Sequence, residues 1–169
     1  MLRKNQIAFS LLETILTISL LSLAIALATP NLVSLINKNR QDSLRETLLT
    51  SLHQGRAVAI LNRQKVEICA STDGLSCVTD WRKGWMTRRS GDTPTLLHRF
   101  QTKPDTHLEW TGFGKTILFH PNGTTPASNG RFYQCAEGKI AWQLILNRQG
   151  RVRQATRAEN LQASSRCTK

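Results

Sequence analysis

The chain has 169 residues, of which 40% are hydrophobic, and a formal net charge of +12. This length is enough for one globular core and hardly enough for two, which excludes a chain of several large domains. The charge says nothing about the fold, but unless it serves solubility alone it predicts attraction to polyanions such as nucleic acid or an anionic surface.

The first segment of the chain is long and apolar. Between Lys4 and Lys38 the only charged residue is Glu13, and Leu16–Leu27 is dense in Leu, Ile and Ala. Such a stretch is long enough to span a bilayer as a helix. Arg3 and Lys4 precede it, so the positive-inside rule places the N-terminus in the cytoplasm and the rest of the chain outside.

A conventional signal peptide is the competing interpretation, because Ala26-Leu27-Ala28 offers a small-x-small cleavage site after the apolar run. Two features favour a longer helix instead. A carboxylate at Glu13 costs about 2.5–3.5 kcal/mol within a membrane segment and is usually functional there. Apolar positions also recur every four residues well beyond the run, at Leu44, Leu48 and Leu52. An amphipathic helix is therefore predicted to continue to about Asn62, with Pro30 bending it rather than ending it.

The N-terminus carries a processing motif. The run Ala8-Phe9-Ser10-Leu11-Leu12-Glu13, followed by the apolar helix, resembles the processing site of type IV prepilins. The resemblance implies that a prepilin peptidase cuts between Ala8 and Phe9 and methylates the new amino terminus of Phe9. Glu13 would then meet that amine on a neighbouring pilin in a filament, since a carboxylate buried in lipid or in a filament core needs a positive partner. The family's usual residue before the cut is Gly, so slow cleavage is expected with Ala8.

After Asn62 the helical pattern gives way to short alternating runs separated by Gly, Pro and Asn-Gly turn signals. The predicted strands are Val66–Ala70, Trp85–Arg88, Leu96–Phe100, His107–Trp110, Ile117–His120, Arg131–Cys135 and Ile140–Leu146. We expect an α+β, pilin-like fold in which an antiparallel β-rich domain packs against the leucine face of the long helix. The expected parts are a leader at residues 1–8, a transmembrane or filament-core helix at 9–36, an amphipathic half at 37–62, and a disulfide-stapled globular domain at 63–169.

The cysteines all follow the apolar segment, which predicts disulfides formed in an oxidising compartment. Of the possible pairings we prefer Cys69 with Cys77, which closes a turn around Asp73-Gly74, and Cys135 with Cys167, which ties the C-terminal tail back to a strand. Zinc is the alternative, but C-x-x-C spacing is absent and the histidines are scattered, so neither a metal nor another cofactor is expected.

Several short motifs follow one another along the globular domain: Cys69, Asp80-Trp81, Gly84-Trp85, His120-Pro121-Asn122-Gly123 and Asn147–Arg153. Their order is similar to that of the GspH/FimT family of minor pilins and pseudopilins. Within that family, the Gly-Arg-x-Arg element from Gly150 to Arg153 resembles the motif of pilins that bind DNA during natural transformation. The resemblance implies a single-pass inner-membrane protein with a periplasmic C-terminal domain, which assembles with other pilins into an extracellular type IV pilus.

Basic residues dominate the C-terminal segment, opposed by Glu159 alone: Arg148, Arg151, Arg153, Arg157, Arg166 and Lys169. Arginine suits bidentate contact with phosphate better than lysine does. If Arg151 and Arg153 lie on a strand, their side chains point to the same side, and Gly150 lets the chain turn before them. A second basic group would extend this surface: Arg82, Lys83, Arg88, Arg89, Arg99 and Lys103.

These residues predict contact with DNA phosphates without reading of bases, hence little sequence preference. Stacking of bases on Trp81, Trp85, Trp110 and Trp142 is the less favoured possibility, because tryptophans in a small β domain usually lie in the core. The function expected is that of a minor pilin that holds extracellular DNA by many weak contacts while a pilus retracts.

The alternative is that the arginines form a solvated face or bind acidic neighbours in a filament. The protein would then be a structural minor pilin that primes pilus assembly, or a type II secretion pseudopilin, without a DNA site. An enzyme is not expected, because no pairing of a nucleophile with a base, no paired carboxylates and no phosphate-binding glycine loop stands out in the sequence.

Overall fold

The computed structural model of the protein describes residues 10–91, 93–104 and 106–167. The predicted processing residues Ala8 and Phe9, and Lys169 of the predicted DNA site, lie outside this range. The chain divides between Arg40 and Gln41 into two compact units, and the helix α1 (Leu11–Leu61) contributes to both.

In the first unit, α1 is exposed along its whole length and is apolar and long enough to cross a membrane. Its hydroxyl side chains donate hydrogen bonds to carbonyl oxygens three or four residues earlier, for example Thr14 to Leu11 at 2.8 Å and Thr29 to Ile25 at 2.7 Å. These hydroxyl groups are thereby satisfied within the helix itself, as a lipid environment would require. The helix continues through Pro30.

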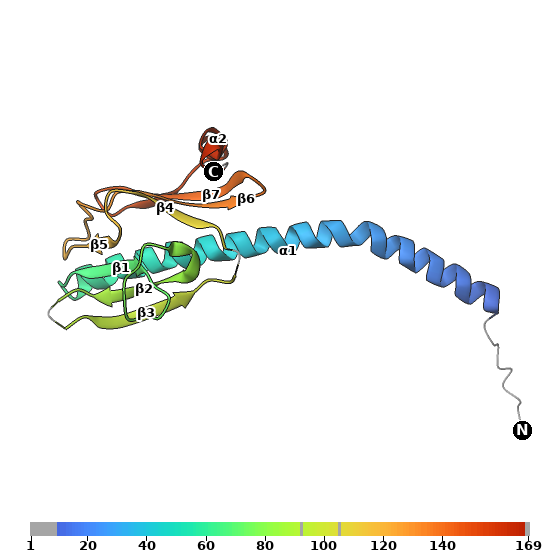
Figure 1. Cartoon of the computed structure of the whole chain (residues 1–169), viewed down its shortest axis with the longest axis horizontal. Coiled ribbons are helices and arrows are strands. Elements are labelled where there is room, and N and C mark those ends of the chain that lie inside the picture. The colour runs from blue at the N-terminus through green and yellow to red at the C-terminus, as the bar shows by residue number, and fades with distance from the viewer. Residues whose placement is uncertain (1–9, 92, 105, 168–169) are drawn as a thin grey trace, which may run out of the picture. The chain divides into compact units, whose positions relative to one another are not determined.

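The second unit combines the rest of α1 with two four-stranded sheets whose strand pairs are all antiparallel (Figure 1). The first sheet has the order β3 (Thr95–Gln101), β2 (Gly84–Arg89), β1 (Val66–Ala70), β5 (Ile117–Phe119). The second has the order β4 (Leu108–Gly112), β6 (Gly130–Ala136), β7 (Lys139–Leu146), β8 (Val152–Gln154). The α+β fold expected from the sequence is confirmed.

One hydrophobic core joins the helix to both sheets. The leucine face of α1 is buried at Leu48 and Leu52, against residues of the first sheet such as Ile68 and of the second such as Leu144. Gly55 allows close approach, because a Cβ there would lie 2.8 Å from Cδ1 of Ile68. Burying a leucine side chain stabilises the fold by about 1.5–3 kcal/mol, so this face holds α1 on the sheets.

The tryptophans belong to the core, as expected. Trp81, Trp85 and Trp142 are at most 3% exposed, and Trp110 is half-buried against Phe132. The indole N–H of Trp85 donates to Oγ of Ser51 on α1 at 3.0 Å, which satisfies a polar group in the interior. The rings of Trp81, Trp85 and Trp142 are therefore enclosed by protein rather than presented for base stacking, and the ring of Trp110 is partly enclosed.

Each predicted strand corresponds to a strand of the structure, and four further elements appear. They are β8, the helix α2 (Arg157–Gln162) and the short 3₁₀ turns η1 (Trp81–Lys83) and η2 (Ser164–Cys167). α2 begins with a capping box, in which Thr156 and Glu159 satisfy each other's backbone N–H groups. Disulfides join Cys69 to Cys77 and Cys135 to Cys167, the pairing preferred above.

Candidate nucleic-acid interface

The turn between β7 and β8 carries the Gly-Arg-x-Arg element. It is closed by the backbone N–H of Gly150, which donates to the carbonyl of Asn147 at 3.0 Å. The side-chain oxygen of Asn147 also accepts the N–H of Arg151 at 2.9 Å. Gly150 has φ +73°, a left-handed conformation that glycine adopts at little cost. The chain therefore reverses direction here and continues directly into Arg151 and Arg153.

Contacts from other segments fix this turn on the protein. A Cβ at Gly150 would lie 2.1 Å from the carbonyl oxygen of Gly123, so only glycine fits against that neighbouring turn. Nε of Arg56, on the last part of α1, donates to the same oxygen at 3.0 Å. Thr125 makes two hydrogen bonds to the turn. Its N–H donates to the carbonyl of Arg148 at 2.8 Å, and its hydroxyl donates to the carbonyl of Asn147 at 2.9 Å. The arginines after the turn thus start from a fixed backbone.

The register of the second sheet places two arginines on either side of one residue. Arg153 of β8 lies opposite Ile145 of β7, which lies opposite Arg131 of β6. Directly opposed residues share a face of the sheet, and the neighbouring Leu144 and Leu146 are buried on the other face. Arg131 and Arg153 therefore occupy the face that points away from the core.

The C-terminal tail adds a third arginine to this face. Arg131, Arg153 and Arg166 line an open hollow of about 450 Å³, together with Ile145, Glu159 and residues of the tail. The disulfide from Cys167 to Cys135 of β6 holds this tail beside the sheet. Arg131 was not among the residues predicted from sequence; its membership follows from cross-strand register, for which the sequence gives no direct signal.

Glu159 neutralises part of this cluster. Its carboxylate accepts two hydrogen bonds from the guanidinium of Arg153, at 2.9 and 2.7 Å, and one from the N–H of Thr156 at 2.7 Å. The Arg153 guanidinium, followed by the Thr156 N–H, lowers the pKa of Glu159 to about 2, and Glu159 in turn raises the pKa of Arg153. Arg153, which is predicted from the sequence to bind DNA phosphate, has a carboxylate partner within the protein.

Arg151 lies next to this cluster. It lines a second hollow of about 380 Å³ with Arg153, Ile145, Asn147 and Val152, so the two motif arginines border the same space. Its side chain is exposed, and it makes no ion pair with another residue in the described part of the chain. Arg151 is the motif arginine that is open to an anion.

Two of the predicted arginines lie outside both hollows. Arg148 is exposed on the turn, with Nε 3.4 Å from the side-chain oxygen of Asn129. Arg157 is the first residue of α2 and is also exposed. Of the predicted arginines, the structure thus brings together Arg151, Arg153 and Arg166 around the two hollows, whereas Arg148 and Arg157 line neither hollow.

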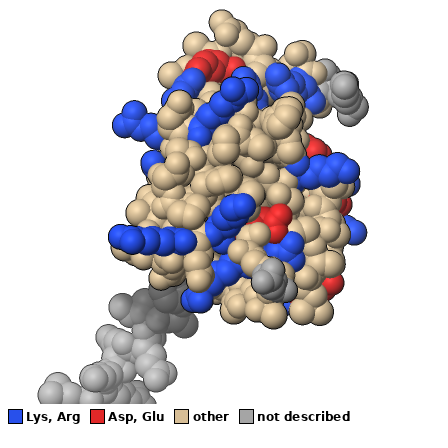
Figure 2. All heavy atoms as spheres, turned by 90° about the vertical axis from the view of Figure 1, so that its left-hand side faces the viewer, with Lys and Arg blue, Asp and Glu red and all other residues tan. Residues whose placement is uncertain are grey.

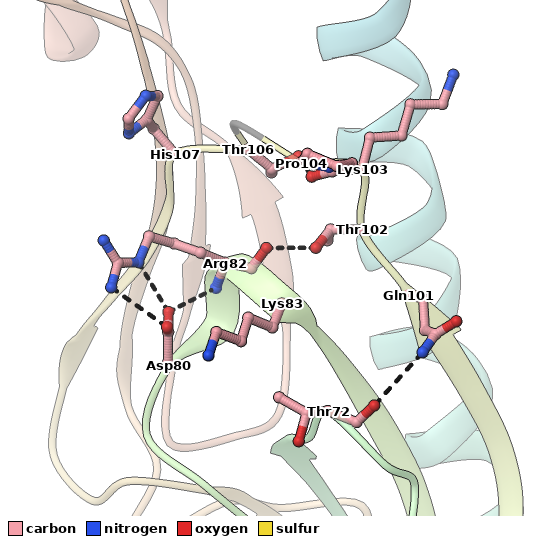
Figure 3. A pocket seen from close by; sticks show the side chains of 10 residues that line it. All are labelled: Thr72, Asp80, Arg82, Lys83, Gln101, Thr102, Lys103, Pro104, Thr106 and His107. Atoms are coloured by element: carbon pink, nitrogen blue, oxygen red, sulfur yellow. Dashed lines mark hydrogen bonds and ion pairs between the residues drawn. The ribbon is translucent and has the colours of Figure 1, made fainter.

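The second basic group does not join the first as a whole, because its members lie at both ends of the first sheet. Arg82 pairs with Asp80 at 2.8 Å and borders a hollow of about 550 Å³ with Lys83 and Lys103 (Figure 3). Figure 3 also shows the hydroxyl of Thr102 donating to the carbonyl of Arg82.

This hollow lies at the end of the first sheet where Gly84 pairs with Gln101, whereas Arg89 pairs with Thr95 at the other end. Of the remaining members, Arg88 is bound to Glu67 at 2.7 Å and Arg99 donates to the carbonyl of Thr72 at 2.7 Å. The expected extension therefore does not form as one surface: Arg82, Arg88 and Arg99 have local partners, and Arg89 lies at the opposite end of the sheet from Arg82.

The sulfurs of the first disulfide lie within 4.8 Å of a carboxylate oxygen of Glu67, a grouping with ligand types that metals use. Both sulfurs belong to the bond between Cys69 and Cys77, and a sulfur in a disulfide is not the thiolate that binds metal. Glu67 is itself paired with Arg88. The disulfide and the ion pair therefore account for this grouping without a metal ion.

Comparisons with known proteins give a family and a fold. The sequence model of the family described as type II transport protein GspH matches residues 45–150. This match includes the turn as far as Gly150 and stops before Arg151 and Arg153. No curated protein sequence matches the chain.

Two crystal structures of the type IV minor pilin FimU of Pseudomonas aeruginosa are similar in fold. One has a TM-score of 0.56 and 23% sequence identity, covering 71% of this chain and 91% of FimU. The other, in a different crystal form, has a TM-score of 0.53 and 23% identity, covering 68% and 92%. At this identity the likeness concerns the fold alone.

Proposed function

The chain belongs to the GspH family of pilin-like proteins, and from this premise we propose that it is a type IV minor pilin that binds extracellular DNA through the arginines at and after the β7–β8 turn. The observation that carries the proposal is the placement of Arg151, Arg153 and Arg166 with Arg131 on one outer face of the second sheet. Guanidinium groups gathered in this way suit phosphate oxygens.

Binding of this kind follows the backbone rather than the bases. Trp81, Trp85 and Trp142 lie in the core and the arginines border open hollows, so in the described part of the chain the arginines are placed to contact phosphates rather than to enclose a base. We therefore expect little sequence preference and strong dependence on salt. Several subunits on one DNA molecule would add avidity, and pilus retraction would draw the DNA toward the cell during natural transformation.

The first unit supplies assembly in this proposal. A prepilin peptidase cuts after Ala8 and methylates Phe9, the apolar part of α1 holds the pilin in the inner membrane, and the same helix enters the filament. The Glu13 carboxylate, which makes no ion pair with another described residue, takes the amino terminus of a neighbouring pilin as its partner. No catalytic role is proposed.

The test is DNA binding by the full chain in neutral detergent micelles, measured with a short fluorescent duplex at several salt concentrations. We expect log affinity to fall linearly with log salt, by about 0.9 per phosphate neutralised. Arg151→Gln/Arg153→Gln should weaken binding and flatten that slope. Lys83→Gln/Lys103→Gln removes the same charge at the other hollow and is the matched control. Equal binding by all forms, or none by the wild-type chain, would remove the proposal.

A second candidate function is a structural minor pilin or pseudopilin without a DNA site. The ion pair between Arg153 and Glu159 favours it, because a motif arginine already has a partner. In that case, deletion of the gene should abolish pilus assembly or secretion, while the arginine substitutions should leave both processes and DNA uptake unchanged.

A further inference from the structure

The end of the second unit where α1 stops is built from four neighbouring segments. The backbone N–H of Ser90 donates to the carbonyl of Lys65 at 2.8 Å, which joins the end of β2 to the start of β1. Val66, the next residue, pairs with Arg89 on one side and with Phe119 on the other. The chain then reaches Gly123, which lies against Gly150 of the β7–β8 turn.

Basic side chains occur in three of these segments. Arg63 and Lys65 follow the helix, Arg89 ends β2, and Arg148 and Arg151 flank the turn. All five are exposed, and none forms an ion pair with another described residue. Figure 2 looks at this end of the molecule and shows Lys and Arg spread across it with few acidic side chains.

We infer that Arg63, Lys65 and Arg89, here termed the helix-end rim, form a second set of phosphate contacts that continues the path begun at Arg148 and Arg151. The inference rests on the proposed function and extends it: DNA held at the β7–β8 turn would run across the end of α1 toward β2. Its partner is the phosphate backbone of nucleic acid, bound without base contacts.

The backbone at the rim is fixed, which keeps these charges in place. Arg63 has φ +51°, a conformation uncommon for a residue with a side chain, and it closes the helix with its N–H donating to the carbonyl of Ile60 at 3.3 Å. Gln64 donates to the carbonyl of Ala59 at 3.2 Å. Strand β1 begins two residues later, so the rim is anchored on both sides.

At the opposite end of the strands a basic residue has an acidic partner, and this difference supports the rim as the phosphate-binding surface. There Arg82 is bound to Asp80 at 2.8 Å. Within the segments that build the rim end, the acidic residues are Glu67, which is already paired with Arg88, and Asp92, which lies outside the described residues. Unpaired cations next to one another favour a polyanion, because each phosphate contact releases counterions.

The experiment compares three variants of the full chain in neutral detergent, by the slope of log affinity against log salt. The rim variant is Arg63→Gln/Lys65→Gln/Arg89→Gln. Its control, Lys83→Gln/Lys103→Gln/Lys139→Gln, loses the same charge at the other end of the strands. The third is Arg151→Gln/Arg153→Gln. Circular dichroism and the unfolding temperature check that each variant keeps the fold.

We expect the rim variant to lose slope by about 0.9 for each phosphate contact removed, and the control to lose clearly less. A rim variant with the wild-type slope, or a control that loses as much, overturns the inference. If the Arg151/Arg153 variant alone weakens binding, the rim fails while the proposed function stands; if the wild-type chain binds no DNA, both fail. A rim variant that binds DNA normally but no longer enters pili would also overturn the inference, because it would show that the rim contacts a neighbouring pilin instead of DNA.

Discussion

Glu159 holds the guanidinium of Arg153 in two parallel hydrogen bonds of 2.9 and 2.7 Å while the same carboxylate caps α2. A carboxylate therefore occupies the position that a phosphate would take on this motif arginine. Any DNA that uses Arg153 must compete with Glu159 or bind beside the pair, and this relationship leads to the first two predictions.

Glu159→Gln should increase DNA affinity several-fold at low salt and steepen the salt slope by about 0.9, because Arg153 becomes available to one more phosphate. Glutamine still accepts the N–H of the capping residue, so α2 should remain formed. Affinity is measured by fluorescence anisotropy over a salt series. Glu137→Gln is the control, since this exposed residue on the β6–β7 turn gives the same change in charge away from the cluster. Equal gains in the two variants would mean that net charge alone is responsible.

The same carboxylate predicts a dependence of stability on pH. The pKa of Glu159 is lowered from 4.5 to about 2, so its stabilising effect is fully present above pH 4.5 and is lost as the pH falls toward 2. The urea midpoint of wild-type protein should therefore drop further between pH 5 and about pH 2.5 than that of Glu159→Gln. Asp73, whose pKa is also lowered, chiefly by the backbone N–H of Ser76, is common to both proteins and cancels in the comparison. Parallel curves for the two proteins would contradict the prediction.

Gly150 in the β7–β8 turn can be compared with Gly138 in the β6–β7 turn, which has a similar φ but no close neighbour in the described part of the chain. Gly150 and Gly138 both have positive φ, +73° and +71°, but a Cβ would clash with the Gly123 carbonyl only at Gly150. Gly138→Ala should destabilise the fold by about 1 kcal/mol, the cost of the left-handed conformation. Gly150→Ala should cost about 1–3 kcal/mol more, because the turn must move away from Gly123. Urea denaturation measures the two losses in free energy of unfolding. Equal losses would show that the backbone at Gly123 moves away from residue 150 at little cost.

The tail disulfide should stabilise the second unit. Cys135 and Cys167 are 32 residues apart, and closing a loop of this size contributes about 2–4 kcal/mol. Cys135→Ala/Cys167→Ala should therefore lower the free energy of unfolding by this order and raise hydrogen exchange in residues 156–167. The core, which does not include the tail, should keep its exchange protection. Unchanged exchange in the tail would show that α2 is held by its other contacts, such as the one from the Gln143 amide to Asn160 at 3.0 Å.

The sequence was informative wherever one short pattern decides a structure. Alternating apolar residues predicted the strands from β1 to β7, and the leucines four residues apart predicted the buried face of α1. α2 was overlooked, although its start carries a readable signal, Thr156 followed three residues later by Glu159. Six residues with no fully buried side chain give too weak a periodicity for a helix to be recognised.

The arrangement of the arginines depends on information that is not local. Arg131 joins the cluster because two strand pairings place it across Ile145 from Arg153, and such register cannot be counted along one chain segment. The pairing of Arg153 with Glu159 spans only six residues, but it depends on where β8 ends and α2 begins, and α2 is not predicted from the sequence. The sequence therefore predicts arginines of the candidate interface but neither the partner of Arg153 nor the division of the second basic group.

The hydrogen bond from Arg56 to Gly123, behind Gly150, also has a mechanical consequence. If a pulled DNA strand is attached at the β7–β8 turn, tension enters the protein there. It is shared between the hydrogen bonds of β7 to its neighbours and, through Gly123, the last turns of α1. A force directed along strands shears many hydrogen bonds at once, whereas a loop without such support would peel away. The proposed attachment point is thus connected, through Gly123 and Arg56, to the longest helix of the described chain.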